Sequence, residues 1–196
     1  MKKPIVIIGI GELAGVFTQG FLRCGYPVYP ITRGMDLEAE CSQIPDPELV
    51  FIMVQESELH KLLAKIPEGW RSKLGLLQNE LLPRDWQSHK IIKPTVTVVW
   101  FEKKKQQLLS NILYSPSFGP KAEIISQALQ AVDIPAPILD NEEQLLYELL
   151  RKALYILTVN IAGLVDNCTV GDLWNKNQSL AKEIAGEVIL VQEKMT

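Results

Sequence analysis

Cysteine and histidine are scarce in this chain. Its 196 residues include three cysteines, Cys24, Cys41 and Cys168, and two histidines, His60 and His89. None of the cysteines forms a CxxC pair, so no recognisable spacing assembles a set of metal ligands, and we predict no metal site. An odd cysteine count without a secretory signal is typical of a reducing compartment, and we expect a cytoplasmic protein.

Long apolar runs and an excess of one charge are also absent. The apolar run at residues 5–8 ends at Gly9 and leads to Glu12, which is too short and broken for a signal-peptide core. No stretch reaches the roughly 18 apolar residues of a membrane span. The formal net charge is only -3, and aromatic residues make up 7% of the chain. We therefore expect neither nucleic acid nor an anionic membrane as a partner.

What the sequence does contain is a series of short β-type runs separated by helical patterns. Residues 4–10 form a continuous apolar run, typical of a strand buried on both faces of a parallel sheet. A glycine turn, a helical pattern and a second β-type run at 26–32 follow, which together predict a βαβ unit. Further strands are expected at 49–54, 74–77, 95–101, 111–114 and 136–139, and further helices at 56–66 and 121–131. The sequence predicts an α/β fold over residues 1–140.

The last quarter of the chain changes character near residue 140. Asp140 and Glu143 make an Asp-x-x-Glu helix start, and a broad apolar stripe follows as far as Leu164. After a break near 167–171, a final helix is expected to carry one apolar face made of Leu180, Ile184, Val188, Val191 and Met195. We predict a short all-α unit over 141–196. Because two such helices cannot bury both faces alone, we expect a homodimer through them.

The glycine turn has the pattern Gly9-x-Gly11-x-x-Ala14. Gly9 permits a tight turn, Gly11 lets the backbone approach a pyrophosphate, and Ala14 is small enough for the helix to pack on the strand. The N–H groups of Glu12 and Leu13, in the first helical turn, would face the phosphates. A plain glycine turn is the alternative. The strand before it and the helix after it favour a Rossmann-type, doubly wound sheet with a dinucleotide site.

The second strand ends in Thr32-Arg33-Gly34. Sites that prefer NAD usually carry an acidic residue at this place, which bonds the ribose hydroxyls. A guanidinium suits the 2′-phosphate of NADP instead. We predict NADP(H) as the cofactor, with Thr32 assisting Arg33. Asp36 is the competing candidate for an NAD-type contact, and a surface arginine in a loop is the alternative reading.

Three further residues could act on a substrate. Asn79 follows the strand at 74–77, and ligands bind beyond strand ends in such sheets, although position alone favours an asparagine that starts a turn. Lys152 and Asn160 lie about 80° apart around one apolar helix and about 12 Å apart along it, so both can border one cleft. A partly buried lysine can donate a proton, while packing alone favours a lysine that snorkels to water. Five other residues are interpreted as packing or surface positions: Cys168, Trp100, Trp174, His60 and His89.

The order of these motifs resembles that of the ketopantoate reductase (2-dehydropantoate 2-reductase) family. That family reads GxGxxG, Arg-Gly, Gln-Asn-Gly and Phe/Ile-Gly-Pro, followed by a helix with a lysine and two asparagines and by an Asn-Gly-Glu-Leu-like turn. The similarity runs over essentially the whole chain. The matching segments here are Gly9-x-Gly11-x-x-Ala14, Thr32-Arg33-Gly34, Leu77-Gln78-Asn79, Phe118-Gly119-Pro120, Lys152 with Asn160, and 167–173.

The resemblance implies an NADPH-dependent reduction of a small 2-oxo acid to a 2-hydroxy acid. It makes Lys152 the group that hydrogen-bonds the substrate carbonyl and supplies the proton. It places Asn79 between nicotinamide and substrate, and makes Asn160 the second of two substrate-binding asparagines. An ammonium beside the ketone oxygen would stabilise the charge that hydride transfer develops there.

The chain also departs from the family pattern. Ile156 stands where the first helical asparagine would fall, Glu80 replaces the glycine after Gln78-Asn79, and Gln55 replaces a lysine after the third sheet strand. Family members continue through further helices with a serine and a glutamate that grip the substrate, and these have no counterpart in the 196 residues. The alternative function is therefore a non-catalytic NADP(H)-binding sensor or regulator.

Overall fold

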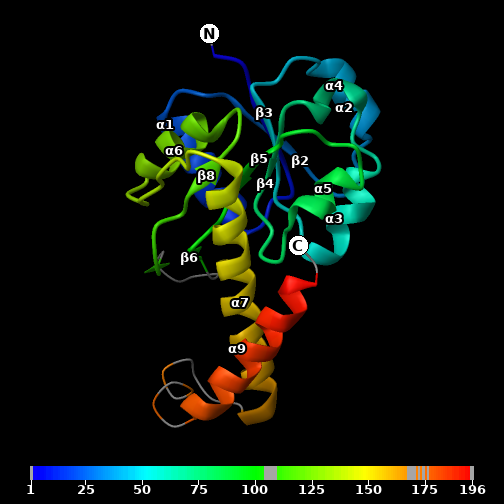
Figure 1. Ribbon diagram of the computed structural model, residues 1–196. Helices are drawn as coiled ribbons and strands as arrows, with labels where there is room; N and C mark the ends of the chain where they lie inside the picture. Colours follow the sequence, from blue (N-terminus) through cyan, green and yellow to red (C-terminus); the bar gives the residue numbers. More distant parts are fainter. Residues whose placement is uncertain are drawn as a thin grey trace.

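The computed structural model describes residues 2–103, 110–166 and 177–194, together with residues 171, 173 and 175. Its centre is a six-stranded sheet in the order β2-β1-β3-β4-β5-β8 (Figure 1). The first five strands are parallel, and the last runs antiparallel to its neighbour. The predicted Rossmann-type sheet is confirmed. Its strands are β1 (Ile5–Ile8), β2 (Val28–Ile31), β3 (Leu49–Ile52), β4 (Leu74–Leu76), β5 (Thr95–Thr97) and β8 (Ser117–Phe118).

Helices cover both faces of the sheet, because the central strands are apolar on both sides. Val6 and Ile8 of β1 belong to one core cluster, and Ile5 and Ile7 belong to a second cluster on the opposite face. The first cluster takes in side chains of α3, α4, α5 and α7, and the second those of α1 and α6. The helices are α1 (Glu12–Arg23), α2 (Leu37–Gln43), α3 (Glu56–Leu63), α4 (Glu68–Arg71), α5 (Pro83–Gln87), α6 (Ala122–Gln130), α7 (Glu142–Asp166) and α9 (Gln178–Glu193).

The far edge of the sheet differs from the sequence-based expectation. The run at 95–101 splits after β5, and β6 (Phe101–Glu102) pairs instead with β7 (Ser110–Asn111) in a separate antiparallel ribbon. The predicted strand at 136–139 is wrong, since only Ile138 makes a β-bridge, to Ser117 of β8. Prolines explain this, because Pro135 and Pro137 accept hydrogen bonds through their carbonyls but have no N–H to donate to a ladder.

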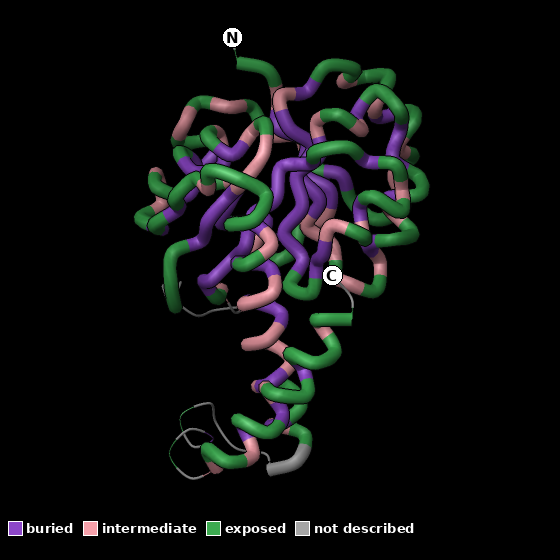
Figure 2. The backbone as a smooth tube through the Cα atoms, in the orientation of Figure 1, coloured by how far each residue is buried: buried purple, intermediate pink, exposed green. Residues whose placement is uncertain are grey.

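The C-terminal helices leave the body of the molecule as an antiparallel pair, α7 and α9, which we call the helical hairpin (Figure 1). Leu145 and Leu149, near the start of α7, share the core of the sheet, whereas the far part of the hairpin has only a thin buried seam (Figure 2). The predicted break at 167–171 lies almost wholly outside the described residues. No described helix is long and apolar enough to cross a membrane.

The helix start near residue 140 is displaced by one position. Asn141, not Asp140, caps α7: its side-chain oxygen accepts the N–H of Gln144 at 2.9 Å. The Gln144 side chain in turn accepts the backbone N–H of Asp140 at 2.9 Å. The side-chain amides of Asn141 and Gln144 thus make the reciprocal hydrogen bonds of this helix start. The predicted pair, Asp140 and Glu143, is wrong.

Candidate functional site

The turn between β1 and α1 has the geometry that a phosphate-binding loop needs. Gly9 has φ +97°, and a Cβ there would lie 2.5 Å from the Met53 carbonyl oxygen, so only glycine fits. Gly11 has an ordinary φ of -73° and is the N-cap of α1, and a Cβ there would meet nothing within 4 Å. A glycine cap has no side chain that could satisfy the first-turn N–H groups of Glu12 and Leu13. Ala14 is buried against the sheet, as expected.

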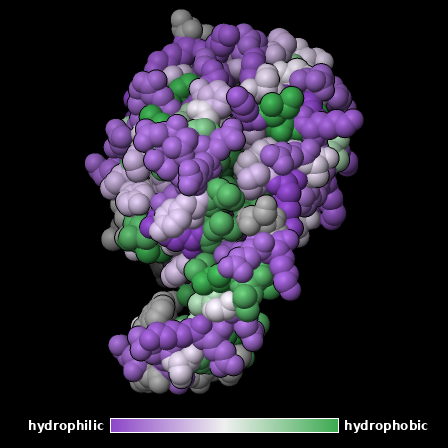
Figure 3. All heavy atoms as spheres, in the orientation of Figure 1, coloured by the Kyte–Doolittle hydropathy of each residue, from purple (hydrophilic) through white to green (hydrophobic). Residues whose placement is uncertain are grey.

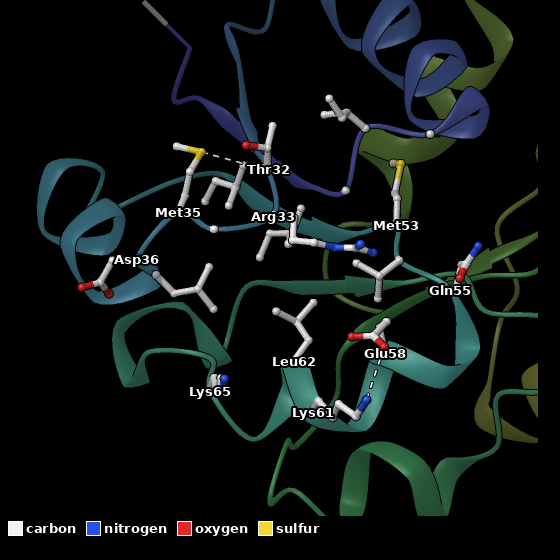
Figure 4. Close-up of a pocket in the computed structure, with 18 of the residues that line it drawn as sticks. Thr32, Arg33, Met35, Asp36, Met53, Gln55, Glu58, Lys61, Leu62 and Lys65 are labelled. Carbon is white, nitrogen blue, oxygen red and sulfur yellow. Dashed lines mark hydrogen bonds and ion pairs between the residues drawn. The ribbon is translucent and has the colours of Figure 1, made fainter.

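A hollow of about 1000 Å³ opens in front of this turn; we call it the switch-point hollow (Figure 4). It lies beyond the ends of β1, β2 and β3, where the strand order reverses and where open α/β sheets bind ligands. The side chain of Arg33 points across it from the end of β2 (Figure 4), and Thr32 also lines it. Two lysines that sequence analysis missed also line the hollow: Lys61 of α3, which pairs with Glu58 at 3.4 Å, and Lys65, just beyond the end of α3.

Asp36 has a structural task. Its side chain accepts the N–H of Glu38 at 3.0 Å and so caps α2. The helix itself was not predicted, although an aspartate before a polar run is a helix-start signal. A carboxylate that caps a helix is less available to a ribose, which weakens the NAD-type alternative. Arg33 makes no ion pair within the described part of the chain.

A second hollow of about 430 Å³ follows along the strand ends; we call it the Asn79 hollow. It shares Val54 and Gln55 with the switch-point hollow, so the two form one path over the edge of the sheet. Gln78 is buried, and its amide donates to the Ile52 carbonyl at 3.2 Å, which ties the end of β4 to the end of β3. Asn79 is thereby left exposed in the hollow.

Glu56, at the start of α3, forms part of the wall of the Asn79 hollow. Burial raises the pKa of its carboxyl group, and the backbone N–H groups of Glu80 and Asn79 oppose this shift. The Glu80 N–H donates to Glu56 at 3.1 Å. Glu80 stands where the family pattern has a glycine, and the Glu56 carboxylate fixes its backbone.

Lys152 is buried, with 7% of its surface exposed. Its amine lies 4.5 Å from the ring centroid of Trp100, three residues beyond the end of β5. Burial lowers the pKa of Lys152 to about 8, and Glu102 opposes this shift. Since β4 and β5 are neighbours in the sheet, Asn79 and Trp100 both extend from the same edge.

Trp100 was assigned to packing or the surface, and it is indeed buried in a core cluster, with 3% of its surface exposed. It holds Lys152 on its ring and also lies 5.1 Å from the guanidinium of Arg151, which pairs with the buried Glu148 at 2.7 Å. Its indole N–H is buried and has no acceptor among the described residues. No pattern in the sequence could reveal this contact, because Trp100 and Lys152 are distant in the chain.

Asn160 is exposed on the part of α7 that has left the sheet, and it lines neither the switch-point hollow nor the Asn79 hollow. Lys152 lines neither of them, so the structure does not place the two side chains at one cleft, and the assignment of Asn160 stays a prediction. The turn at 167–170 lies outside the described residues. Among the described residues, no group of three or more histidine, cysteine, aspartate or glutamate side chains is placed to hold a metal ion.

Among known proteins, this chain matches solved structures by its fold and not by its sequence. No family model and no curated protein matches the sequence. A ketopantoate reductase of the PanE/ApbA family from Ralstonia eutropha superimposes with a TM-score of 0.70 at 14% identity, covering 100% of this chain and 75% of that one. A dimeric ketopantoate reductase from Staphylococcus aureus gives a TM-score of 0.67 at 15% identity, covering 93% and 76%.

D-mandelate dehydrogenase in complex with NADH gives a TM-score of 0.65 at 16% identity, covering 99% of this chain and 74% of that one. Identities this low establish the fold alone. The structural resemblance extends from the glycine turn through the helical hairpin. The chain therefore has the fold of the ketopantoate reductases over about three quarters of their length.

Proposed function

We propose that this protein is an oxidoreductase that uses NADP(H) to reduce a small 2-oxo acid or a related carbonyl compound. One observation carries the proposal. A phosphate-type glycine turn and a guanidinium line the switch-point hollow, the adjoining hollow holds Asn79, and a buried amine lies over Trp100 just beyond β5, the neighbour of β4 in the sheet. Residues 1–140 would be the NADP-binding domain, and 141–196 a substrate and dimerisation unit.

The chain offers a residue for each part of the cofactor. The backbone of Gly11, Glu12 and Leu13 would hold the pyrophosphate, and Arg33 with Thr32 the 2′-phosphate. Asn79 would orient the nicotinamide. When bound, NADPH supplies a hydride to the carbonyl carbon of the substrate.

Lys152 would supply the proton. With a pKa of about 8, its ammonium is largely charged at neutral pH, yet releases a proton more readily than an exposed lysine. Donation to the carbonyl oxygen completes the alcohol, and the amine regains a proton from solvent. Trp100 fixes the amine, since the ring attracts the cation and limits its movement.

The proposal is tested by mixing the protein with NADPH and a panel of 2-oxo acids and following the absorbance of the reduced nicotinamide. Consumption of NADPH with at least one acid is expected. Tight NADPH binding without turnover would favour the second candidate, a binding-only sensor or regulator. Ile156 and the exposed position of Asn160 favour that candidate, because they leave the helix with a poorer substrate grip.

The partner that we propose is a second copy of the chain, bound through the helical hairpin. Its helices expose large apolar side chains, with Leu164 88% and Leu190 61% exposed. Sedimentation at micromolar concentration should give twice the chain mass of 22.1 kDa, and Leu190→Glu should lower it toward that of one chain. Ile92→Glu, at an apolar residue 82% exposed outside the hairpin, is the matched control. A strict monomer before any substitution contradicts the proposed dimer.

The compartment that we propose is the cytoplasm. Cys24 and Cys41 are free thiols. Free thiols persist where the surroundings are reducing.

A further inference from the structure

The segment that follows β4 is tied at two points to the segment that follows β3. Residues 77–80 carry the exposed Asn79, and residues 52–56 join β3 to α3. Because β3 and β4 are parallel neighbours, the two segments leave the sheet at the same edge. Two polar side chains connect them, Gln78 and Glu56.

The first connection is the side-chain amide of Gln78, which has 6% of its surface exposed. Its nitrogen donates to the carbonyl oxygens of Ile52 at 3.2 Å and of Val54 at 3.4 Å, and its oxygen accepts the N–H of Leu77 at 3.2 Å. Hydrogen bonds away from water are stronger than those in contact with it. Gln78 therefore fixes the backbone that precedes Asn79.

The second connection is the carboxylate of Glu56, the first residue of α3. It accepts the backbone N–H of Glu80 at 3.1 Å, and the N–H of Asn79 also favours its charged form. Its place in the first helical turn acts in the same direction, because the amino end of a helix is its positive end. The backbone is thus held on both sides of Asn79, while the Asn79 side chain stays exposed in the Asn79 hollow.

The surroundings of Glu56 oppose its charge. Apolar side chains gather in the notch between the body of the molecule and the helical hairpin (Figure 3), and Glu56 borders the hollow there. Burial raises the pKa of its carboxyl group, and the like charges of Glu80 and Asp85 add to this shift. The other charged or titratable groups that border the same hollow are His60, Arg84 and Glu187.

We propose that Glu56 is a positioning residue, which holds the backbone of Asn79 and Glu80 so that the Asn79 side chain keeps the orientation in which it meets the nicotinamide. This inference rests on the proposed function for the identity of the ligand. A carboxylate can accept both N–H groups, whereas a protonated carboxyl group turns one oxygen into a donor. The orientation of Asn79 therefore depends on a charged group of a different helix.

The first test uses NMR on the protein without cofactor. In Glu56→Ala, the N–H of Glu80 should exchange with solvent at least about tenfold faster than in the parent, since it loses a charged acceptor. The N–H groups within β4 should exchange as before. Glu68→Ala is the matched control, because Glu68 likewise begins a helix, α4, but its side chain is 95% exposed. Unchanged exchange of the Glu80 N–H in Glu56→Ala overturns the inference.

The ionisation of Glu56 provides a signature that a purely structural residue would not give. In the parent, the chemical shift of the Asn79 N–H should follow the protonation of Glu56, with a midpoint above the ordinary value of 4.5 because the pKa is raised. Glu56→Gln keeps one acceptor oxygen and should fold, yet it should lack this transition. A transition that persists in Glu56→Gln contradicts the proposed contact.

The second test adds NADPH. In the parent, NADPH should shift the side-chain amide signals of Asn79, and Glu56→Ala should lose this shift. The affinity of Glu56→Ala for NADPH should stay within about threefold, because the phosphates are held elsewhere. Its kcat with a 2-oxo acid should fall at least about tenfold, since the nicotinamide is no longer aligned. Glu56→Gln should lie between the two, and Glu68→Ala should equal the parent.

The outcomes separate this inference from the proposed function. If Glu56→Ala exchanges faster and loses the Asn79 shift while the parent shows no turnover, the inference is supported and the enzyme is refuted. If the parent reduces a 2-oxo acid and Glu56→Ala does so with the same kcat, the inference is refuted and the enzyme is kept.

Discussion

Replacing Lys152 by methionine is expected to abolish turnover and, at the same time, to stabilise the folded protein. Loss of a positioned proton donor typically lowers kcat by about 10²- to 10⁴-fold. Burial lowers the pKa of Lys152 from 10.5 to about 8, so holding the ammonium inside the fold is unfavourable. At 1.36 kcal/mol per pKa unit, less the attraction of the Trp100 ring, methionine should raise the free energy of unfolding by about 2 kcal/mol at pH 7.

The stability gain has a defined pH dependence. Below about pH 8 the lysine is charged in both the folded and the unfolded chain, so its burial penalty is present in full. Between about pH 8 and the unfolded value of 10.5, the folded chain holds fewer protons than the unfolded chain, and the penalty disappears as pH rises. Urea titrations of the parent and of Lys152→Met should therefore differ most below pH 8 and converge above pH 10.5.

A lysine that serves only in packing would give the opposite result. If Lys152→Met is less stable than the parent at pH 7 and keeps its turnover, the lysine is a packing residue. A group that weakens the fold and yet sustains the activity is what a catalytic site is expected to contain.

The two glycines of the first turn should respond to alanine in opposite ways. Gly9→Ala forces a side chain into φ +97° and to within 2.5 Å of a carbonyl oxygen. We expect it to lower the free energy of unfolding by at least about 2 kcal/mol. Gly11→Ala has an allowed φ and open space, so the free energy of unfolding should change by less than about 1 kcal/mol.

The affinity for NADPH provides a second measurement on these glycine variants. The methyl group of Gly11→Ala would stand where the pyrophosphate approaches the backbone, so this stable variant should bind NADPH at least about tenfold more weakly. Thermal melts and calorimetry on both variants measure the two quantities independently. A Gly11→Ala protein that binds NADPH as tightly as the parent does would show that the turn is structural only.

The cofactor side of the molecule could be predicted from the sequence because its signals are local. The apolar run before Gly9 predicted a strand buried on both faces, and the glycine spacing predicted the turn. These features depend on neighbours within a few residues. The end of β2 was also predicted from local sequence. Arg33 lies directly after this strand, as predicted, and lines the switch-point hollow.

The surroundings of Lys152 could not be predicted in the same way, because they depend on contacts between distant segments. Trp100 meets Lys152 only because α7 and the segment after β5 pack in the same core cluster. The hollow between the body and the helical hairpin is lined mostly by residues of α3, α5, α7 and α9, and the sequence predicted no helix at α5. The spacing of Lys152 and Asn160 gave their angle on the helix, but not the point at which α7 leaves the sheet.

The most direct test of the account is calorimetric titration of the protein and of Arg33→Ala with NADPH and with NADH. The account predicts that the unaltered protein binds NADPH at least about tenfold more tightly than NADH, because the guanidinium pairs with the 2′-phosphate. Arg33→Ala should lose that preference while its affinity for NADH stays within about twofold. No heat with either nucleotide, or an unchanged preference in Arg33→Ala, would contradict it.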